Sequence, residues 1–219
     1  MTVSPNEATG ISVAGLGRVN VVPDVALLSL GVEVTRPTVA EARGEAATAM
    51  DAVESSLIEN GVAEADIQTM FFNIYPQYFY SENEPPRITG FTVSNQVEVK
   101  VRNIDTVSTV LDSAIDAGGD NVRVNNISFT VDEPEQYLDQ AREQAVADAR
   151  ARAEQLATLA GVELGSIRAI SESFGGGIQP PIPLMAERSV AQGAGGDSSI
   201  NPGETRITLT VSVTFNVGE

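Results

Sequence analysis

Seven segments of the chain are rich in apolar residues that alternate with polar ones, partly in the first two and cleanly in the last, which predicts strands. Turn signals such as Pro23-Asp24 separate neighbouring segments, and a polar, proline-containing loop is expected at Ser81 to Arg87. The predicted strands are Ile11 to Asn20, Val25 to Thr35, Ile67 to Tyr80, Thr89 to Val101, Val122 to Val131, Ile167 to Phe174 and Thr205 to Val217.

Three other segments repeat apolar residues every three or four positions, which predicts helices. The third follows Asp132-Glu133-Pro134, where acidic residues and proline favour a helix start. Its stripe is mostly alanine, so we expect this helix to lie close against a sheet. The helices cover residues 39–57, 104–115 and 138–160, and glycine stop signals follow at Asn60-Gly61, Gly118-Gly119 and Gly161.

The resulting order is β-β-α-β-β-α-β-α-β-β, which predicts an α+β fold with antiparallel or mixed β-sheets packed by three helices. Strand-helix-strand units at residues 25–80 and 89–131 indicate an internal repeat, or two α+β units that merely look alike. We expect one domain over residues 11–217, preceded by a disordered leader at 1–10. A flexible Gly/Pro-rich loop is expected at 175–203, which is longer than a connection in a compact domain normally runs.

The 219 residues include neither cysteine nor histidine. This excludes thiol nucleophiles, disulfides, Ser-His-Asp triads and zinc sites built on those side chains. We expect no catalytic residue, no cofactor and no metal.

The formal net charge is −17, from 30 acidic and 13 basic residues. Nucleic-acid binding requires a clustered basic face, so the charge excludes that class of partner. It equally disfavours attachment to anionic lipid. An acidic surface of this kind reflects either a saline habitat or a genome that prefers arginine codons. No apolar stretch reaches the roughly 18 residues of a membrane-spanning helix, so we expect no such segment.

Aromatic residues concentrate in one predicted strand. Since neighbouring side chains in a strand point to opposite faces, the rings would occupy both faces. This favours a partner surface, because aromatics are enriched at interface hot spots. The alternative is core packing on one face and loop contacts on the other. The six residues are Phe71, Phe72, Tyr75, Tyr78, Phe79 and Tyr80.

The Gly/Pro-rich segment contains apolar residues that could contact a neighbouring subunit as an arm, or belong to the tip of a floppy hairpin. Apolar side chains in such a stretch suggest something to bind. They are Ile178, Ile182, Leu184 and Met185.

Two other motifs have structural and functional interpretations. Gly15-Leu16-Gly17 lacks the third glycine and the helix of a dinucleotide site, so a bulge or a close backbone approach in the first strand is favoured. Acidic residues near the third helix start fit either the helix dipole or a carboxylate site for acid-base chemistry or a hard cation. They are Asp132, Glu133, Glu135 and Asp139, with Asp116 and Asp120 in a preceding turn.

Seven short motifs, in order and spacing, resemble the SIMPL family, whose bacterial members include periplasmic immunogenic proteins and oxidative-stress defence proteins. The resemblance implies an α+β fold, export to the envelope and, in some members, assembly into large rings. It implies no catalytic residue. The motifs are ISVAGLGRVNVVPD at 11–24, NGV at 60–62, DIQT at 66–69, NIYPQY at 73–78, ITGF at 88–91, AREQAVADARARAEQLA at 141–157 and PGE at 202–204.

We therefore expect an exported protein, periplasmic or extracellular in the cell envelope, from which a signal peptide has been removed. It is expected to be non-enzymatic and to act through homo-oligomeric assembly and protein binding, in envelope integrity or oxidative-stress defence. One alternative is a carrier of a small apolar ligand, which would require an apolar cavity. Another is a hydrolase that uses carboxylates alone, with two acids converging in a pocket.

Overall fold

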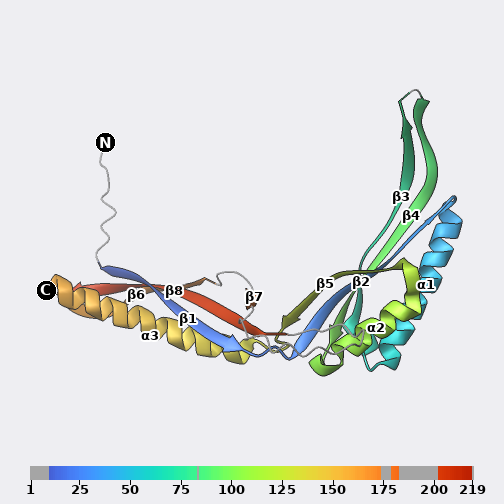
Figure 1. The fold of residues 1–219 in the computed structure, drawn as a ribbon. Coiled ribbons are helices and arrows are strands. Elements are labelled where there is room, and N and C mark those ends of the chain that lie inside the picture. Colours follow the sequence, from blue (N-terminus) through green and yellow to red (C-terminus); the bar gives the residue numbers. More distant parts are fainter. Residues whose placement is uncertain (1–9, 83, 174–178, 183–201, 219) are drawn as a thin grey trace, which may run out of the picture. The chain divides into compact units, whose positions relative to one another are not determined.

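The computed structural model describes residues 10–82, 84–173, 179–182 and 202–218. Strands and helices follow the predicted order, with one additional short strand before the last, and the α+β class is confirmed (Figure 1). The strands are β1 Ile11–Val21, β2 Val25–Arg36, β3 Ile67–Ser81, β4 Glu84–Val101, β5 Val122–Thr130, β6 Glu163–Ser173, β7 Gln179–Ile182 and β8 Glu204–Gly218, and the helices are α1 Val39–Glu59, α2 Val107–Gly118 and α3 Glu135–Ala160.

The described residues form two compact units, each with its own hydrophobic core. The central unit comprises the described residues of 23–130 together with Pro202. The terminal unit comprises those of 10–22, 131–182 and 203–218. The expectation of one domain over residues 11–217 stays a prediction, and within that range the chain builds two cores.

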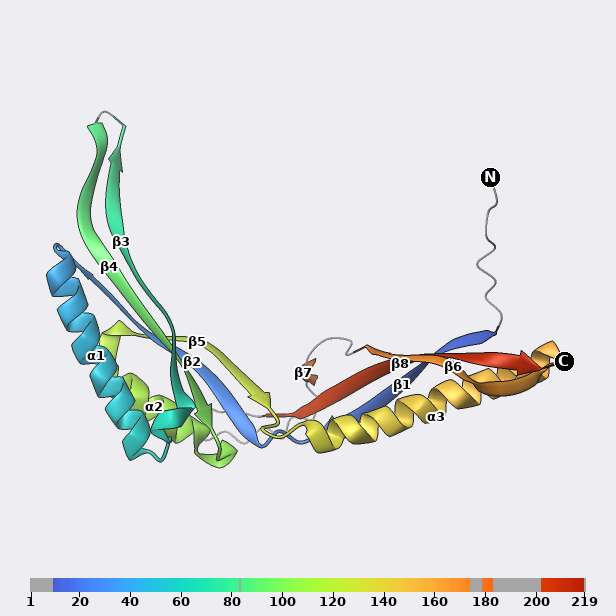
Figure 2. The ribbon, with the colours of Figure 1, turned by 180° about the vertical axis from the view of Figure 1, so that it is seen from behind.

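The central unit contains an antiparallel sheet of order β3-β4-β2-β5. β4 lies between the two strands that α1 connects, and β2 lies between the two that α2 connects. The predicted strand-helix-strand units thus interlock in one sheet, which is the ferredoxin-like split β-α-β arrangement. Both helices lie on the same face of this sheet (Figure 2).

Large aliphatic side chains fill the core of the central unit. Leu28 and Leu30 alternate along β2 and are fully buried beneath α1 and α2. α1 contributes Val53 and Leu57 to the same core. Thr38 begins this helix with a capping box, in which its hydroxyl accepts the Glu41 N–H at 3.3 Å.

In the terminal unit, α3 packs on an antiparallel sheet of order β1-β8-β6, to which the short β7 adds beside β8. The predicted stripe is buried from Ala141 to Ala153, but at its end Leu156 and Ala160 are exposed and Ala157 is buried instead. A Cβ at Gly15 would overlap the carbonyl oxygen of Ala145, and one at Gly17 would overlap that of Ala141. The predicted close backbone approach at Gly15-Leu16-Gly17 is confirmed, and α3 is its partner.

One local prediction was wrong. The expected loop at Ser81 to Arg87 is largely strand, because β3 continues to Ser81 and β4 starts at Glu84. Pro85 and Pro86, which lack an N–H, fall within an irregular part of the ladder, between Phe79 paired with Arg87 and Ser81 paired with Glu84. The flexible loop expected at 175–203 stays a prediction, because residues 179–182 form β7 and most of the others lie outside the described part of the chain.

Candidate interaction surfaces

The aromatic strand cluster, defined as the six rings of β3, lies outside the core. Its members are exposed by 41% for Tyr75 to 73% for Tyr80. Burial of large aromatic side chains is among the strongest stabilising contributions available to a protein. Six aromatic side chains exposed to solvent on one strand therefore mark β3 as a candidate interaction surface.

The position of β3 in the sheet explains this exposure. β3 pairs with β4 and is the outermost strand of its sheet, whereas α1 packs mainly on β2, β4 and α2. The bonding between β4 and β2 ends at the pair Phe91 and Arg36. Beyond it, β3 and β4 continue as a two-stranded ribbon past the helices (Figures 1 and 2).

Rings occupy both faces of β3, as the alternation of the strand predicted. Phe71 lies opposite Gln96 and Tyr75 lies opposite Thr92, on the face turned away from the helices. Phe72 lies on the other face, two residues before Ile74, which pairs with the buried Val93. The alternative of core packing on one face does not hold, because Phe71, Phe72 and Tyr75 are all more than 40% exposed.

At the ribbon the rings contact one another and a cation. The ring centroids of Tyr78 and Tyr80 are 6.2 Å apart. The Arg87 guanidinium carbon lies 5.3 Å from the centroid of Phe79, within the range of a cation–π contact. Despite these contacts, Tyr78, Phe79 and Tyr80 remain 48%, 49% and 73% exposed.

The position of the predicted arm relative to the aromatic strand cluster is not described. Ile178, Leu184 and Met185 lie outside the described residues. Ile182 is described by its backbone alone, which pairs in β7 with Glu204 of β8. The arm stays a prediction.

The acidic residues near the start of α3 do not form a described metal site. Across residues 10–82, 84–173, 179–182 and 202–218, no group of three or more Asp or Glu side chains could hold a metal ion. Asp139 instead forms an ion pair with Arg142, which also bonds Glu172 of β6 at 2.7 and 3.1 Å.

The pKa is shifted at three places away from the aromatic strand cluster: at Glu54, at Asp148, and at the Arg142–Glu172 pair, whose hydrogen bond raises the pKa of the arginine and lowers that of the glutamate. Burial raises the pKa of Glu54 on α1, and the nearby charges of Asp51 and Glu64 raise it further. The N–H of Leu16 donates to Asp148 and lowers the pKa of that carboxyl. Of these groups, Arg142 lines the hollow on α3, and it is held in an ion pair with Glu172, so the shifts point to no paired general acid and base.

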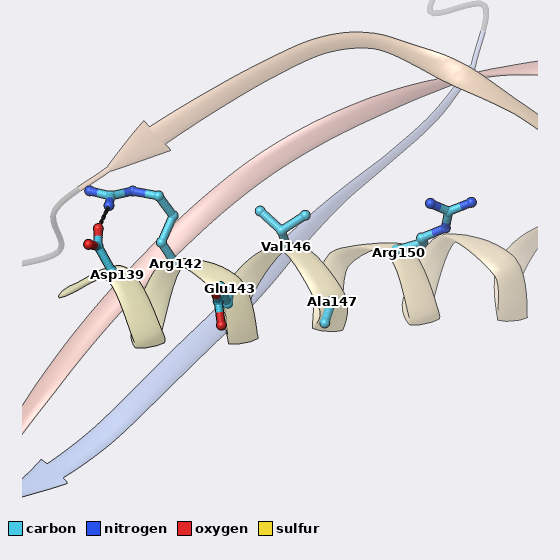
Figure 3. Close-up of a pocket in the computed structure, with 6 residues that line it drawn as sticks. All are labelled: Asp139, Arg142, Glu143, Val146, Ala147 and Arg150. Atoms are coloured by element: carbon cyan, nitrogen blue, oxygen red, sulfur yellow. Dashed lines mark hydrogen bonds and ion pairs between the residues drawn. The ribbon is translucent and has the colours of Figure 1, made fainter. Parts of the chain in front are cut away.

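A hollow of about 590 Å³ lies along α3 (Figure 3). Arg142, Val146 and Arg150 rise from the helix toward the strands in this view. The described lining residues all come from one helix, so they form an open surface and not an enclosing wall. They are Asp139, Arg142, Glu143, Val146, Ala147 and Arg150.

Sequence reasoning missed β6 as a surface. Ile167 and Ile170 of this strand are 49% and 54% exposed. Their spacing of three does not follow the alternation of a strand, because the ladder with β8 shifts register between Leu164 and Ala169. That irregular spacing of two isoleucines was the one available signal.

Known proteins similar to this chain agree with the resemblance of the motifs. Residues 11–215 match the model of the SIMPL family, described as a protein of unknown function (DUF541). The chain belongs to the SIMPL family. It is 34% identical over 226 residues to the 26 kDa periplasmic immunogenic protein of Brucella melitensis, covering 99% of this chain and 87% of that protein. It is 30% identical over 160 residues to the uncharacterized protein YggE of Escherichia coli K12, covering 73% and 64% respectively.

The names of these relatives also indicate where in the cell the protein is located. The predicted periplasmic or cell-envelope location of this SIMPL chain is confirmed by the periplasmic name of the Brucella relatives. Within the described part of the chain, no helix combines the length and the hydrophobicity needed to cross a membrane.

Proposed function

We propose that this SIMPL protein is a non-enzymatic protein of the cell envelope that forms homo-oligomers and binds envelope proteins through the aromatic strand cluster. The observation that carries the proposal is the exposure of all six rings on an outermost strand. Roles in envelope integrity or oxidative-stress defence belong to the same proposal and rest on the family.

Stability gives a second reason to expect a partner at this surface. An isolated two-stranded ribbon is marginally stable in water. Here the ribbon from Gln77 to Gly90 also exposes Tyr78, Phe79, Tyr80 and Ile88. Contact with another chain would bury these side chains and give the two-stranded ribbon a surface to pack against.

The primary test is absolute mass by light scattering after size exclusion, at low and high salt. Salt screens repulsion between subunits of charge −17, so a discrete oligomer is expected to be favoured at high salt. The double variant Phe72→Ser/Tyr80→Ser is expected to lower the mass. The control Ile58→Ser/Leu159→Ser removes two apolar residues that are also exposed but lie outside β3, and should keep it. A strict monomer at every salt concentration would refute the assembly.

Binding of a different envelope protein is tested separately with a photo-crosslinking amino acid at position 80 in the periplasm. The same amino acid at position 159 is the control. Crosslinks at position 80 to a second protein species are expected. Crosslinks solely between copies of this chain would leave assembly as the whole role of the surface.

The hollow on α3 is the observation that favours the carrier alternative, because about 590 Å³ is the size of a small-molecule site. Its described lining comes from one helix, whereas a carrier encloses most of its ligand. The hydrolase alternative finds two acids there, Asp139 and Glu143, but Asp139 is paired with Arg142. Both alternatives therefore rank below assembly.

A further inference from the structure

The antiparallel sheet of the central unit has one face that the described helices do not cover. α1 and α2 lie on the opposite face, where β2 presents Leu28 and Leu30 to the core (Figure 2). Neighbouring side chains of a strand point to opposite faces, so the residues between the buried ones form the open face. This face is polar, whereas the covered face is aliphatic. Its residues are Ser29, Gly31, Glu33 and Thr35 on β2, and Glu98, Gln96, Ser94 and Thr92 opposite them on β4.

Two of the six rings of the aromatic strand cluster lie on the open face. Phe71 pairs with Gln96 and Tyr75 pairs with Thr92, and the ladder between them is regular. At about 3.3 Å per residue, the distance along β3 from Phe71 to Tyr75 is about 13 Å. The two rings are 45% and 41% exposed. They therefore flank a strip of β3 that has a polar residue, Asn73, at its centre.

Neutral polar side chains beside these rings are held by hydrogen bonds across the strands. The Gln77 side-chain nitrogen donates to the Thr92 hydroxyl at 2.9 Å, and that hydroxyl oxygen lies 2.7 Å from the hydroxyl oxygen of Thr35. The Gln96 side-chain nitrogen donates to the Ser29 hydroxyl. An amide side chain has two donor hydrogens and a carbonyl acceptor, so both glutamines keep hydrogen-bonding capacity after these bonds. The open face thus presents oriented, uncharged donors and acceptors.

The charges on the four-stranded part of this face balance. Nε of Arg123 lies 3.9 Å from the Glu33 carboxylate. Next to Lys100, Asp66 and Arg102 bond each other at 2.7 and 2.8 Å. Electrostatic complementarity therefore favours neither an acidic nor a basic partner here, although the whole chain carries −17, and the face fits a polar partner without charge. The charged residues of the face are Glu33, Glu98, Lys100 and Arg123, two of each sign.

We propose that the open face of the central sheet binds an uncharged oligosaccharide that lies along β3. A pyranose ring has apolar C–H faces and a rim of hydroxyl groups that both donate and accept hydrogen bonds. Phe71 and Tyr75 stack against the C–H faces of two of its sugars. Asn73, Ser94 and Gln96 bond the hydroxyl groups between them. The middle of a sheet face offers no free backbone groups for an added peptide strand, and a nucleic acid requires a basic surface.

This site goes beyond the proposed function, because it uses the face turned away from the helices and needs no second subunit. Tyr78, Phe79 and Tyr80 lie further along β3, on the ribbon, and are separate from it. Cell envelopes contain polysaccharide chains, so the periplasmic location brings a partner of this class within reach.

The probes are cellotetraose and tetra-N-acetylchitotetraose, two uncharged β-linked tetrasaccharides, titrated into the full chain and followed by saturation-transfer NMR of the sugar protons. Their comparison distinguishes plain hexoses from N-acetylated ones. For at least one sugar we expect saturable binding with a dissociation constant of about 1 mM or below. Because the ligand is uncharged, this constant should change by less than about twofold between low and high salt. Absence of saturable binding of both sugars up to about 10 mM, or a steep dependence on salt, would overturn the proposal.

A matched pair of variants locates the site. Phe71→Ser and Phe72→Ser remove adjacent rings of similar exposure, 45% and 48%, that point to opposite faces. We expect Phe71→Ser to weaken binding of the tighter sugar by about fivefold or more, and Phe72→Ser by less than about twofold. Tyr75→Phe keeps the second ring and should bind within about twofold of wild type. Equal effects of the two serine variants would contradict the face assignment and overturn the proposal.

Light scattering separates this site from assembly. Phe72→Ser/Tyr80→Ser, which is expected to lower the mass, should still bind the sugar as wild type does. A loss of mass with Phe71→Ser would show that a second copy covers the open face, which overturns the sugar site and leaves the assembly standing. Sugar binding by a chain that is a strict monomer would support the sugar site and refute the assembly.

Discussion

The central and terminal units cover their sheets in opposite ways. In the central unit, α1 and α2 bury large aliphatic side chains such as Leu28 and Leu57 between helix and sheet. In the terminal unit, α3 supplies alanines, and β1 supplies Gly15 and Gly17 where the backbones approach. The first core is therefore sensitive to lost volume and the second to added volume.

The largest expected effect is the loss of a central leucine. Leu28→Ala should lower the free energy of unfolding by about 3 to 4 kcal/mol, because the site is fully buried and the surroundings collapse incompletely. Leu159→Ala removes the same atoms from a side chain that is 79% exposed and should change it by less than about 0.5 kcal/mol. Urea unfolding followed by circular dichroism checks both. Similar costs for the two variants would contradict the assignment of the core.

Adding one methyl group tests the terminal unit. Gly17→Ala should cost about 2 to 3 kcal/mol, because the new Cβ overlaps the backbone of Ala141 and β1 or α3 must shift. Gly44→Ala adds the same group in α1, where no atom beyond the neighbouring residues and the nearby backbone of the helix lies within 4 Å, so it should stabilise by up to about 1 kcal/mol. The same denaturant series measures the pair. A neutral Gly17→Ala would show that the helix and strand are not in close contact.

A smaller effect depends on pH at the covered edge of β1. The Leu16 N–H lowers the pKa of Asp148, and Arg152 bonds the same carboxyl. A lowered folded-state pKa means that the carboxylate contributes stability above its unfolded value near pH 4, and that this contribution is lost as pH falls through the folded pKa. The difference between wild type and Asp148→Ala should thus be present at pH 7 and shrink toward pH 3.

The control for this prediction is Glu143→Ala, an exposed acidic residue of the same helix. It should show a smaller difference from wild type at pH 7. An Asp148→Ala difference that does not change between pH 7 and pH 3 would mean that the carboxylate charge has no role at this edge.

The smallest effect on stability is expected on β3, which sharpens the contrast between exposed and buried apolar residues. Tyr80→Ser should change the free energy of unfolding of the free chain by less than about 0.5 kcal/mol, because the ring is 73% exposed. A much larger loss at high dilution would mean that the ring stabilises the single chain and would weaken the case for a partner surface.

Periodicity predicted most of the fold from the sequence. The alternation along Thr205 to Val217 and the alanine stripe from Ala141 to Ala153 appear as β8 and α3. It failed at Ser81 to Arg87, where polar and proline residues suggested a loop. There the ladder accommodates the prolines by a shift of register, which depends on the partner strand and not on local composition.

The residues of the aromatic strand cluster were predicted from the sequence, but the exposure of both faces of the strand was not. Six aromatic residues in ten made β3 conspicuous, yet the sequence left open whether one face was covered. That depends on which strands α1 and α2 cover. The position of β6 at the edge of its sheet was missed. Its sequence does not show that, among the described residues, β8 is the one strand that pairs with it.

The sequence by itself determined the α+β order, the family and the exclusion of histidine and cysteine chemistry, because local periodicity and composition are properties of neighbouring residues. The tertiary structure decided which edges and faces remain open. Gly17 and Ala141, for example, are far apart in the chain but meet in the terminal unit. Contacts at such separation determine that β1 is covered while β3 and β6 present exposed apolar side chains, and no local pattern encodes that difference.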